Sequence, residues 1–489
     1  MPGPHIILFL SDQHRADVLG AGGDPVVRTP VLDRLAGEGG NFRQAYCNAP
    51  VCGPSRMSLL TSRMPGRTGV LTNRAALPSD IPTMAHAFAA AGYDTVLCGR
   101  MHFIGPDQSH GFTERLVGDI GPVDPAFREA PQGPFDYTTG QHRSTLAVSG
   151  SGCAPAEIYD ATVVAAAIAR MEQQDPDRPL FLVIGTYAPH NPYVCREDLY
   201  AFYRDALPGV SKEEIQSFRN TTHPMMQEWI RARGMDEVEA EEVDRSRAAY
   251  YGMVETMDSL IGEVVEAVDR VLGPDRTFFS YCSDHGDLAG QYGLFWKSNF
   301  LEGSVRVPWI CRGPGIRPGG VIETPVSLLD LAPTLLDLAG LPNLPGAGGM
   351  SLKPFLETDS PPPERPIVSV LADPRCGPSA MVRSGPWKLI YGSRRKESIL
   401  YHLETNPSET GGGEPPGEEA EKALVRLSAF LPDERLFRQM EEAIQEGPER
   451  AKLFSAIPPS PENGTSHQWQ VDLARLRCRT DLADGEVGP

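Results

Sequence analysis

Short apolar runs alternate with longer amphipathic segments along most of the chain. Four runs rich in β-branched and aromatic residues predict buried strands at 6–10, 95–98, 180–185 and 278–282. Apolar residues recur at helical spacing over 156–174 and 248–271, and over shorter stretches at 30–36, 82–91 and 329–338. Strands that alternate with helices in this way indicate an α/β fold, with a large, mostly parallel sheet flanked by helices.

The pattern changes near residue 355. Ser360 and the three prolines that follow it are typical of a linker. Beyond it the sequence predicts short strands at 367–371, 380–382 and 387–391. The segment 409–419 is rich in Gly, Pro and Glu, and we expect it to be mobile. A helix at 420–444 and an irregular tail after 458 follow. We therefore predict two domains, a large one over 1–357 and a smaller α+β domain over 358–489.

Each of the four predicted strands of the large domain is followed closely by polar residues. These residues are Ser11 and Asp12, Arg100 and His102, His190, and Asp284 and His285. In open α/β sheets the functional site lies beyond the carboxyl ends of the strands. Four separate segments are therefore expected to deliver polar side chains to one site.

Composition narrows the classes of function. The 489 residues include 45 Lys and Arg against 64 Asp and Glu, a net charge of −19 that argues against a nucleic-acid partner. Nine cysteines without CxxC pairs argue against a zinc cluster and a secreted disulfide framework. The sequence starts without a basic segment or cleavage site and contains no run near the roughly 20 apolar residues that span a bilayer. We therefore expect a cytoplasmic protein with no membrane partner.

The segment from Cys52 to Arg63 carries the most specific chemistry. Pro54 suits a first helical turn, and Leu59 and Leu60 suit its buried face, so Cys52 is predicted to lie at a helix N-terminus. The helix dipole favours an anion there, which would place residue 52 against a negatively charged substrate. Taken alone, Cys52 is also compatible with a buried structural cysteine.

Cys52-x-Pro54-x-Arg56, followed by Leu-Leu-Thr, resembles the signature of the type I sulfatases of the alkaline phosphatase superfamily. In that family a formylglycine-generating enzyme oxidises the cysteine to formylglycine. The resemblance covers nearly the whole chain and is closest to the choline-sulfatase and arylsulfatase branch, with matching segments at 77–82, 99–108, 110–112, 250–253, 284–287 and 302–308. It implies an alkaline-phosphatase-like fold and hydrolysis of small-molecule sulfate esters. Cys376 begins a similar Cys-Gly-Pro-Ser stretch, but Ala380 replaces the arginine, so we interpret Cys376 as structural.

The resemblance also implies one divalent metal ion. Its ligands would be Asp12, Gln13, Cys52 as formylglycine, Asp284 and His285. Oxygen donors suit Ca²⁺, Mg²⁺ or Mn²⁺, and an imidazole shifts the preference toward Mn²⁺. Taken alone, either Asp12 or Asp284 could equally be a cap at the end of a strand, but two donor pairs after two buried strands favour a ligand set.

The remaining roles are also implied by position in the family motifs. Hydrated formylglycine 52 would be the nucleophile, because one hydroxyl can attack sulfur and the other can later drive release of sulfate. Arg56 would orient the diol, and Lys297 would bind sulfate. His190 would bind sulfate and protonate the leaving oxygen, and His102 would deprotonate the second hydroxyl. Arg100 stands where most members of the family have Lys.

Substrate and assembly are less defined. Asn73 and Asp373 match substrate-binding positions of the choline branch, but the segment 121–130 lacks the expected Trp, so we predict an aryl or alkyl sulfate rather than choline sulfate. The alternatives are a phosphonate monoester or phosphodiester hydrolase, a non-catalytic anion-binding protein, and a zinc phosphatase. The tail around Trp469 resembles one that reaches a neighbouring subunit in choline sulfatases, which predicts a homo-oligomer.

Overall fold

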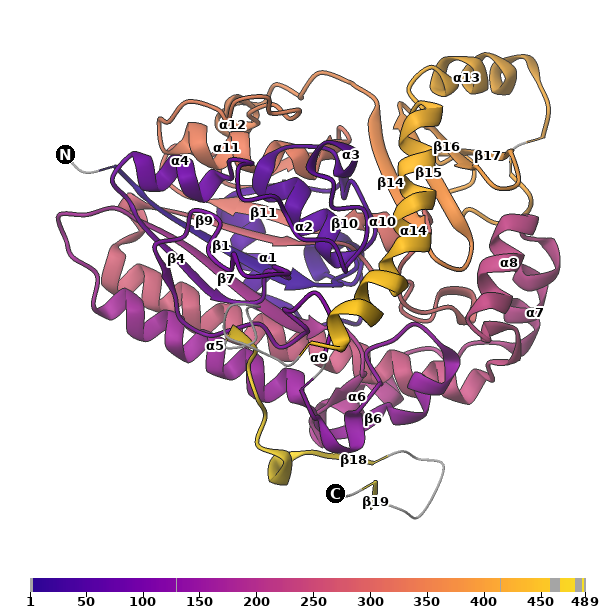
Figure 1. The fold of residues 1–489 in the computed structure, drawn as a ribbon, viewed down its shortest axis with the longest axis horizontal. Helices are drawn as coiled ribbons and strands as arrows, with labels where there is room; N and C mark the ends of the chain where they lie inside the picture. The colour runs from indigo at the N-terminus through magenta and orange to yellow at the C-terminus, as the bar shows by residue number, and fades with distance from the viewer. Residues whose placement is uncertain (1–2, 129, 414, 458–466, 480–485, 488–489) are drawn as a thin grey trace.

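The structure, a computed structural model, describes residues 3–128, 130–413, 415–457, 467–479 and 486–487. Its centre is an eight-stranded sheet in the order β12-β2-β11-β9-β1-β7-β4-β5. Figure 1 labels β11, β9, β1, β7 and β4 of this sheet. The four strands predicted from the apolar runs are neighbours in this sheet and pair in parallel: β9 (Thr277–Ser283), β1 (His5–Asp12), β7 (Leu180–Pro189) and β4 (Asp94–Gly99). The predicted α/β class with a large, mostly parallel sheet is therefore confirmed.

Both faces of the central sheet are buried, and this explains why its strands are apolar throughout. Alternate residues of β1 enter two separate cores, because successive side chains of a strand point to opposite faces. Ile7 and Phe9 belong to the core beneath α5 and α9, whereas Leu8 packs with residues of α2, α4 and α11. The covering helices are α1 (Pro30–Glu38), α5 (Pro155–Glu172) and α9 (Ala240–Ala267) on one face, and α2 (Cys52–Thr61), α4 (Met84–Ala90) and α11 (Leu331–Leu338) on the other.

The longest helix, α9, begins eight residues before the predicted start at 248 and is followed by a π-helical turn over Val268–Leu272. The polar stretch 240–247 shows no apolar periodicity, so the pattern did not reveal it. A capping box sets the true start: the Glu239 side chain accepts from the backbone of Glu242, whose carboxylate accepts from the Glu239 N–H at 2.9 Å.

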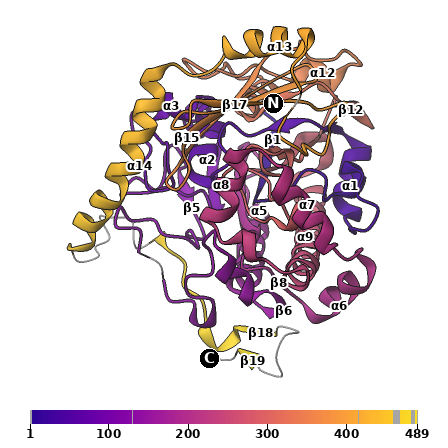
Figure 2. The same cartoon turned by 90° about the vertical axis from the view of Figure 1, so that its right-hand side faces the viewer.

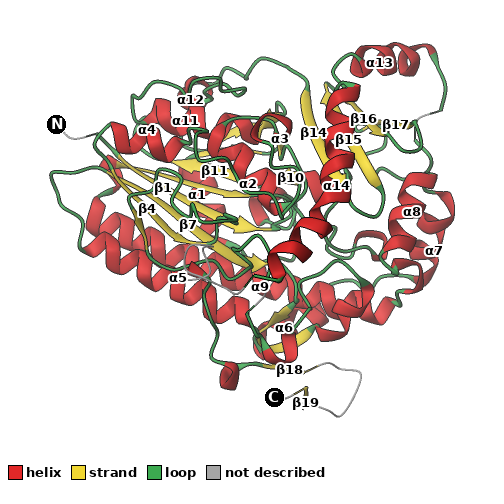
Figure 3. Cartoon of the chain, viewed as in Figure 1, coloured by secondary structure: helices red, strands yellow, loops and turns green. Residues whose placement is uncertain are grey.

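The C-terminal part contains a second, four-stranded antiparallel sheet, as Figure 3 shows. Its strands are β14 (Ile367–Asp373), β15 (Gly377–Ser384), β16 (Trp387–Gly392) and β17 (Glu397–His402). Three of them were predicted, and the fourth, β17, was not. The antiparallel C-terminal sheet is thus confirmed, while the domain limit at 357/358 stays a prediction.

The single helix predicted over 420–444 is wrong. Two helices occupy this region, α13 (Glu418–Ser428) and α14 (Glu434–Ser455), because Pro432 cannot continue a helix. Asp433 caps the second one by accepting from the Leu436 N–H at 2.9 Å. Helix α14 packs on β14 and β15 and runs down one side of the molecule (Figure 2).

The tail is also more ordered than predicted. Strand β18 (Arg477–Arg479) pairs with β6 (Gly150–Cys153), so the tail is not irregular throughout. The Trp469 ring packs edge-on against Tyr159 of the same chain, with centroids 5.1 Å apart. A role of this tail in a homo-oligomer stays a prediction. No helix in the described part of the chain has the length and apolar character needed to cross a bilayer.

A buried charge cluster fixes the start of the segment expected to be mobile. Glu409 is only 1% exposed, and its carboxylate accepts from Lys388 Nζ at 2.7 Å. The same Nζ donates to Glu302 Oε1 at 2.8 Å, which ties β16 to the short helix α10 (Glu302–Val305). Burial raises the pKa of Glu409, whereas the charge of Lys388 outweighs burial at Glu302 and lowers its pKa to about 2. The expectation of mobility is therefore wrong at Glu409.

We expect Lys388→Met to lower the free energy of unfolding by about 3–5 kcal/mol, because it leaves the buried carboxylate of Glu409 without a cation and removes from Glu302 the nearer of its two cations, the other being Arg306 at 3.9 Å. Urea unfolding followed by fluorescence would measure the loss. Lys422→Met is the matched control, since Lys422 pairs with Glu418 on the exposed surface of α13, and its effect should stay within about 0.5 kcal/mol. Equal effects of the two substitutions would contradict the role given to the cluster.

Candidate active site

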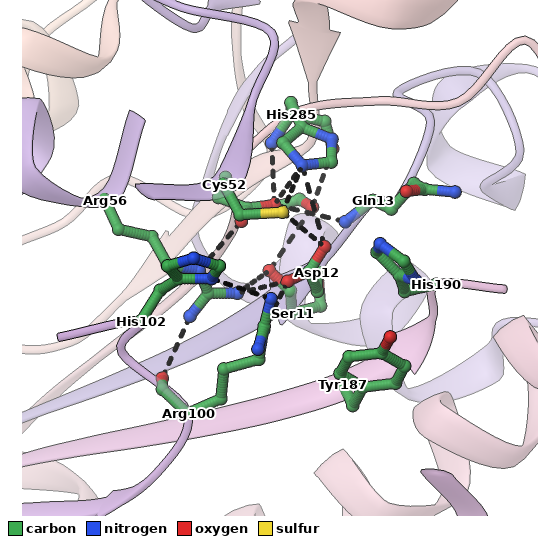
Figure 4. A network of polar contacts seen from close by, with 12 residues as sticks. Ser11, Asp12, Gln13, Cys52, Arg56, Arg100, His102, Tyr187, His190 and His285 are labelled. Atoms are coloured by element: carbon green, nitrogen blue, oxygen red, sulfur yellow. Dashed lines mark hydrogen bonds and ion pairs between the residues drawn. The ribbon is translucent and has the colours of Figure 1, made fainter. Parts of the chain in front are cut away.

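The carboxyl ends of the four central strands bring the predicted polar residues to one edge of the sheet. Asp12 is the last residue of β1, and Asp284 follows β9 directly. His190 follows β7, and Arg100 follows β4. Figure 4 shows Asp12, Arg100 and His190 near Cys52, together with Arg56 and His102. The predicted convergence of four segments is what the topology produces.

Cys52 is the first residue of α2, as predicted, and every residue of this helix is buried. The backbone here is closely packed: the Gly53 N–H donates to Asn73 Oδ1 at 2.9 Å, and a Cβ at position 53 would lie 3.3 Å from His102 Cδ2. Position 53 therefore favours glycine. The N-terminus of a fully buried helix gives residue 52 a positive electrostatic environment suited to an anion.

Four potential metal ligands meet at this point. One ligand atom from each of Asp12, Cys52, Asp284 and His285 lies within 4.8 Å of the other three. His285 Nε2 is 3.2 Å from Cys52 Sγ and 3.6 Å from a carboxylate oxygen of each aspartate. His285 Nδ1 bonds the Gly286 carbonyl at 3.0 Å, so this nitrogen is the donor and the lone pair of the neutral ring lies on Nε2.

This group of donors fits a divalent cation. Burial would lower the pKa of His285, but the negative charges of Asp284 and Cys52 outweigh it and raise that pKa. The position thus favours positive charge. Two carboxylate oxygens and an imidazole nitrogen that converge in a fully buried place are costly without a cation and are typical ligands for one.

Gln13, the fifth predicted ligand, adjoins the group but uses its side chain elsewhere. Its backbone N–H donates to Asp284 Oδ1 at 3.1 Å. Its amide nitrogen donates to Asp287 at 2.5 Å, and its amide oxygen accepts from Lys297 Nζ. Ligation of a metal by Gln13 stays a prediction, and Asp287 is a partner that the sequence did not indicate.

Arg56 joins the two aspartates. It is fully buried, and its Nε donates to Asp284 Oδ2 at 2.7 Å while Nη2 donates to Asp12 Oδ2 at 3.2 Å. Burial alone would raise the pKa of Asp12, but the positive charges around it, of which Arg100 is the largest, hold it well below its usual range. Both aspartates are therefore oriented by a buried arginine, and Asp12 is kept ionised.

Arg100 bridges three groups. Its Nε donates to Asp12 Oδ2 at 2.6 Å, Nη1 to Asp119 Oδ1 at 2.9 Å, and Nη2 to His102 Nδ1 at 3.0 Å. Because a guanidinium only donates, His102 carries its proton on Nε2, which donates to the Asn73 carbonyl at 3.2 Å. Burial and the charge of Arg100 lower the pKa of His102 to about 4. His102 is thus neutral at pH 7.

His190 and Lys297 complete the inner wall. His190 Nδ1 bonds the Asn191 carbonyl at 2.7 Å, which leaves the lone pair on Nε2. Burial and the charge of Lys297 hold the pKa of His190 well below its usual value. Lys297 is only 3% exposed, and its Nζ donates to Gln13 Oε1, which holds this nitrogen inside the site.

The inner residues open into a cavity of about 490 Å³, whose described lining includes Cys52, Asn73, His190, Lys297 and Asp373. Asp373 forms an ion pair with the buried Arg233, a residue that the sequence did not indicate. Its other oxygen accepts from the backbone N–H groups of Arg375 and Cys376, both at 2.8 Å. Cys376 lies near Arg233 and is not part of the described lining, in line with a structural role.

The fold and this buried site define a hydrolase of the alkaline phosphatase superfamily. A model of the sulfatase family matches residues 4–341, and a model of the C-terminal part of N-sulphoglucosamine sulphohydrolase matches residues 290–412. The chain belongs to the sulfatase family and is a sulfuric ester hydrolase.

Named relatives agree with this family. The chain is 34% identical over 429 residues to a choline-sulfatase of Rhizobium meliloti (strain 1021), covering 83% of this chain and 81% of that protein. It is 29% identical over 395 residues to an arylsulfatase of Clostridium perfringens (strain 13 / Type A), covering 72% and 78%. The crystal structure of a phosphonate monoester hydrolase of Agrobacterium radiobacter shares the fold, with a TM-score of 0.71, 23% identity, and coverage of 89% and 96%.

Proposed function

We propose that this protein hydrolyses aryl or alkyl sulfate monoesters with formylglycine derived from Cys52 as the nucleophile. The observation that carries the proposal is the position of Cys52. It opens a buried helix, and its Sγ lies 3.2 Å from His285 Nε2, within the group that also contains Asp12 and Asp284. A formylglycine-generating enzyme would act on this residue before or during folding, since Cys52 is only 1% exposed in the folded chain.

The charges around residue 52 suit one sulfate group. Arg56, Arg100 and Lys297 supply fixed positive charge in a buried place, where each is worth more than in water. Asp12, Asp284, His285 and the side chain of residue 52, with Gln13 beside them, would hold a Ca²⁺, Mn²⁺ or Mg²⁺ ion. When bound, such an ion supplies charge that neutralises sulfate oxygens and makes a hydroxyl more acidic.

A hydrated aldehyde at position 52 carries two hydroxyls on one carbon, one to attack sulfur and one whose deprotonation releases sulfate. Arg56 would orient this diol through its bonds to Asp12 and Asp284. His190 Nε2 would take up a proton as the anion enters beside Lys297 and pass it to the leaving oxygen. His102 would deprotonate the second hydroxyl, which requires that its Nδ1 exchange the hydrogen bond from Arg100.

The second candidate is hydrolysis of phosphonate monoesters or phosphodiesters, favoured by the fold shared with a phosphonate monoester hydrolase. A sulfate monoester and a phosphodiester each carry one negative charge, so the positive charges of Arg56, Arg100 and Lys297 would suit both. The two substrates differ in the size and hydrogen bonding of the second substituent, whereas the residues at position 52 and around it would serve either reaction.

The test compares the two reactions on one leaving group. Protein made together with a formylglycine-generating enzyme is checked for the aldehyde by mass spectrometry of the peptide that carries residue 52. We expect kcat/KM for 4-nitrophenyl sulfate to exceed that for 4-nitrophenyl phenylphosphonate by about tenfold or more, a difference of about 1.4 kcal/mol in transition-state binding. The reverse order would replace the sulfatase proposal with the second candidate. Binding of sulfate by converted protein without any turnover would indicate an anion-binding protein.

A further inference from the structure

The aromatic rings that line the cavity are covered by arginines of the protein itself. Arg74 Cζ lies 4.5 Å from the centre of the Phe127 ring, and Arg100 Cζ lies 5.0 Å from that of Tyr187. A quaternary ammonium such as choline binds to the face of an aromatic ring. Here one face of each ring is already occupied by a guanidinium, so these rings are poorly suited to a cationic substrate.

The cavity also lacks a free negative charge among its described residues. Asp373 is the one carboxylate in that lining, and Arg233 neutralises it through a buried ion pair. The Arg233 guanidinium in turn lies 4.4 Å from the centre of the Trp229 ring. The position that the choline branch uses for its substrate is therefore closed by an internal cation.

Two further arginines stand at the exposed part of the cavity wall, on different loops. Arg74 precedes α4, and Arg375 lies in the turn between β14 and β15. Neither guanidinium forms an ion pair with a carboxylate in the described part of the chain, although the protein has 64 acidic residues against 45 basic ones. By contrast, the other two arginines of the described lining, Arg100 and Arg233, form ion pairs with buried aspartates.

Arg375 is held in place without being neutralised. Its Nη1 donates to the Gln141 carbonyl at 2.6 Å. The Gln141 side chain donates to Ser298 Oγ at 2.9 Å, one residue from the sulfate-binding position Lys297. Partial burial and the charge of Arg233 outweigh the attraction of Asp373 and lower the pKa of Arg375. A fixed, unpaired guanidinium facing a cavity is a ready oxyanion site.

We propose that Arg74 and Arg375 form a second anion subsite that binds a carboxylate or a second sulfate on the alcohol part of the substrate. This rests on the proposed function, because the first sulfate occupies the inner site at residue 52. The preferred substrates are accordingly sulfate esters that carry a further negative charge, and choline sulfate is a poor one.

The test uses two substrates that differ in that charge, 4-carboxyphenyl sulfate and its neutral amide analogue, 4-carbamoylphenyl sulfate. For each protein the ratio of kcat/KM for the carboxylate to that for the amide is measured. Arg74→Gln and Arg375→Gln are each expected to lower this ratio about tenfold, the effect of losing one charge-assisted hydrogen bond. Each variant is compared with the parent on the same substrate, so the difference in leaving groups cancels.

Arg34→Gln and Arg270→Gln are the matched controls. Each removes one exposed arginine charge away from the cavity, and each should leave the ratio unchanged. If Arg74→Gln and Arg375→Gln lower both rates equally, the two arginines merely attract anions in general, and the subsite is refuted. A ratio equal to that of the parent refutes it as well.

Failure of the proposed function would give a different result from failure of the subsite. Converted parent protein would then turn over neither sulfate ester, whatever residue stands at 74 or 375. In that case calorimetric titration of Cys52→Ala protein still tests the subsite, because tighter binding of the carboxylate than of the amide, lost on Arg375→Gln, supports it. Equal binding of the two compounds would overturn it. Thermal melting of each variant confirms folding, which exposed Arg→Gln changes should preserve.

Discussion

Replacing Cys52 with alanine is expected to lower kcat/KM for 4-nitrophenyl sulfate by about 10⁴-fold or more, because the proposed nucleophile forms by oxidation of the Cys52 side chain at its thiol, which alanine lacks. Alanine cannot be converted to formylglycine. The substitution should leave the fold intact, since it removes one sulfur atom and keeps the bonds of Arg56 to Asp12 and Asp284. Steady-state kinetics on purified protein and a thermal melt would measure the two effects.

Cys376→Ala is the matched control, because Cys376 also begins a Cys-Gly-Pro-Ser stretch. Its thiol lies near Arg233 and outside the described lining of the cavity, and burial and Asp373 raise its pKa to about 11. It is thus a protonated thiol without a substrate to attack, and its loss should leave kcat/KM within about twofold. Turnover by Cys52→Ala near the parent rate would refute the mechanism.

The parts of the fold that were predictable are those in which burial dictates composition. Strands β1, β4, β7 and β9 lie in the middle of the sheet between two helical layers, so their sequences are apolar runs. The strands β2 (Gly40–Phe42) and β11 (Trp309–Arg312), farther out in the sheet, were not predicted; each is short and includes a polar residue, Asn41 in β2 and Arg312 in β11. The break between α13 and α14 had a local signal, Pro432, that the helical period on either side obscured.

The site residues also divide into those with a local sequence signal and those without one. Asp12, Cys52, Asp284 and His285 were recognisable because each sits in a short motif at the end of a strand or the start of a helix. Arg233 had no such motif: it is 140 residues from Asp373, and only the tertiary fold brings the pair together. Asp373 was predicted to bind substrate from its match to the choline branch, and the sequence did not indicate that Arg233 neutralises it in the structure.

Removing divalent cations is expected to abolish turnover and to destabilise the folded protein, and restoring Ca²⁺, Mn²⁺ or Mg²⁺ should reverse both effects. Without a cation, the carboxylates of Asp12 and Asp284 and the lone pair of His285 face one another within 4.8 Å in a buried place. Binding of a cation at one hundred times its Kd would stabilise the folded state by about 2.7 kcal/mol. Dialysis against a chelator, followed by thermal melts and assays at rising concentrations of each ion, measures the effect.

The rise in melting temperature on adding a divalent cation, here called the melting shift, should depend on the proposed ligands and not on buried aspartates in general. Asp284→Asn is expected to remove most of the melting shift, because this substitution deletes a carboxylate charge from the donor group. Asp258→Asn is the matched control: Asp258 is also buried, but it accepts from the N–H groups of Val31 and Leu32 at the start of α1, so the shift should survive there. Cys52→Ala should likewise keep a shift, since three ligands remain although turnover is lost. A cation-dependent shift that persists in Asp284→Asn would place the metal elsewhere in the molecule.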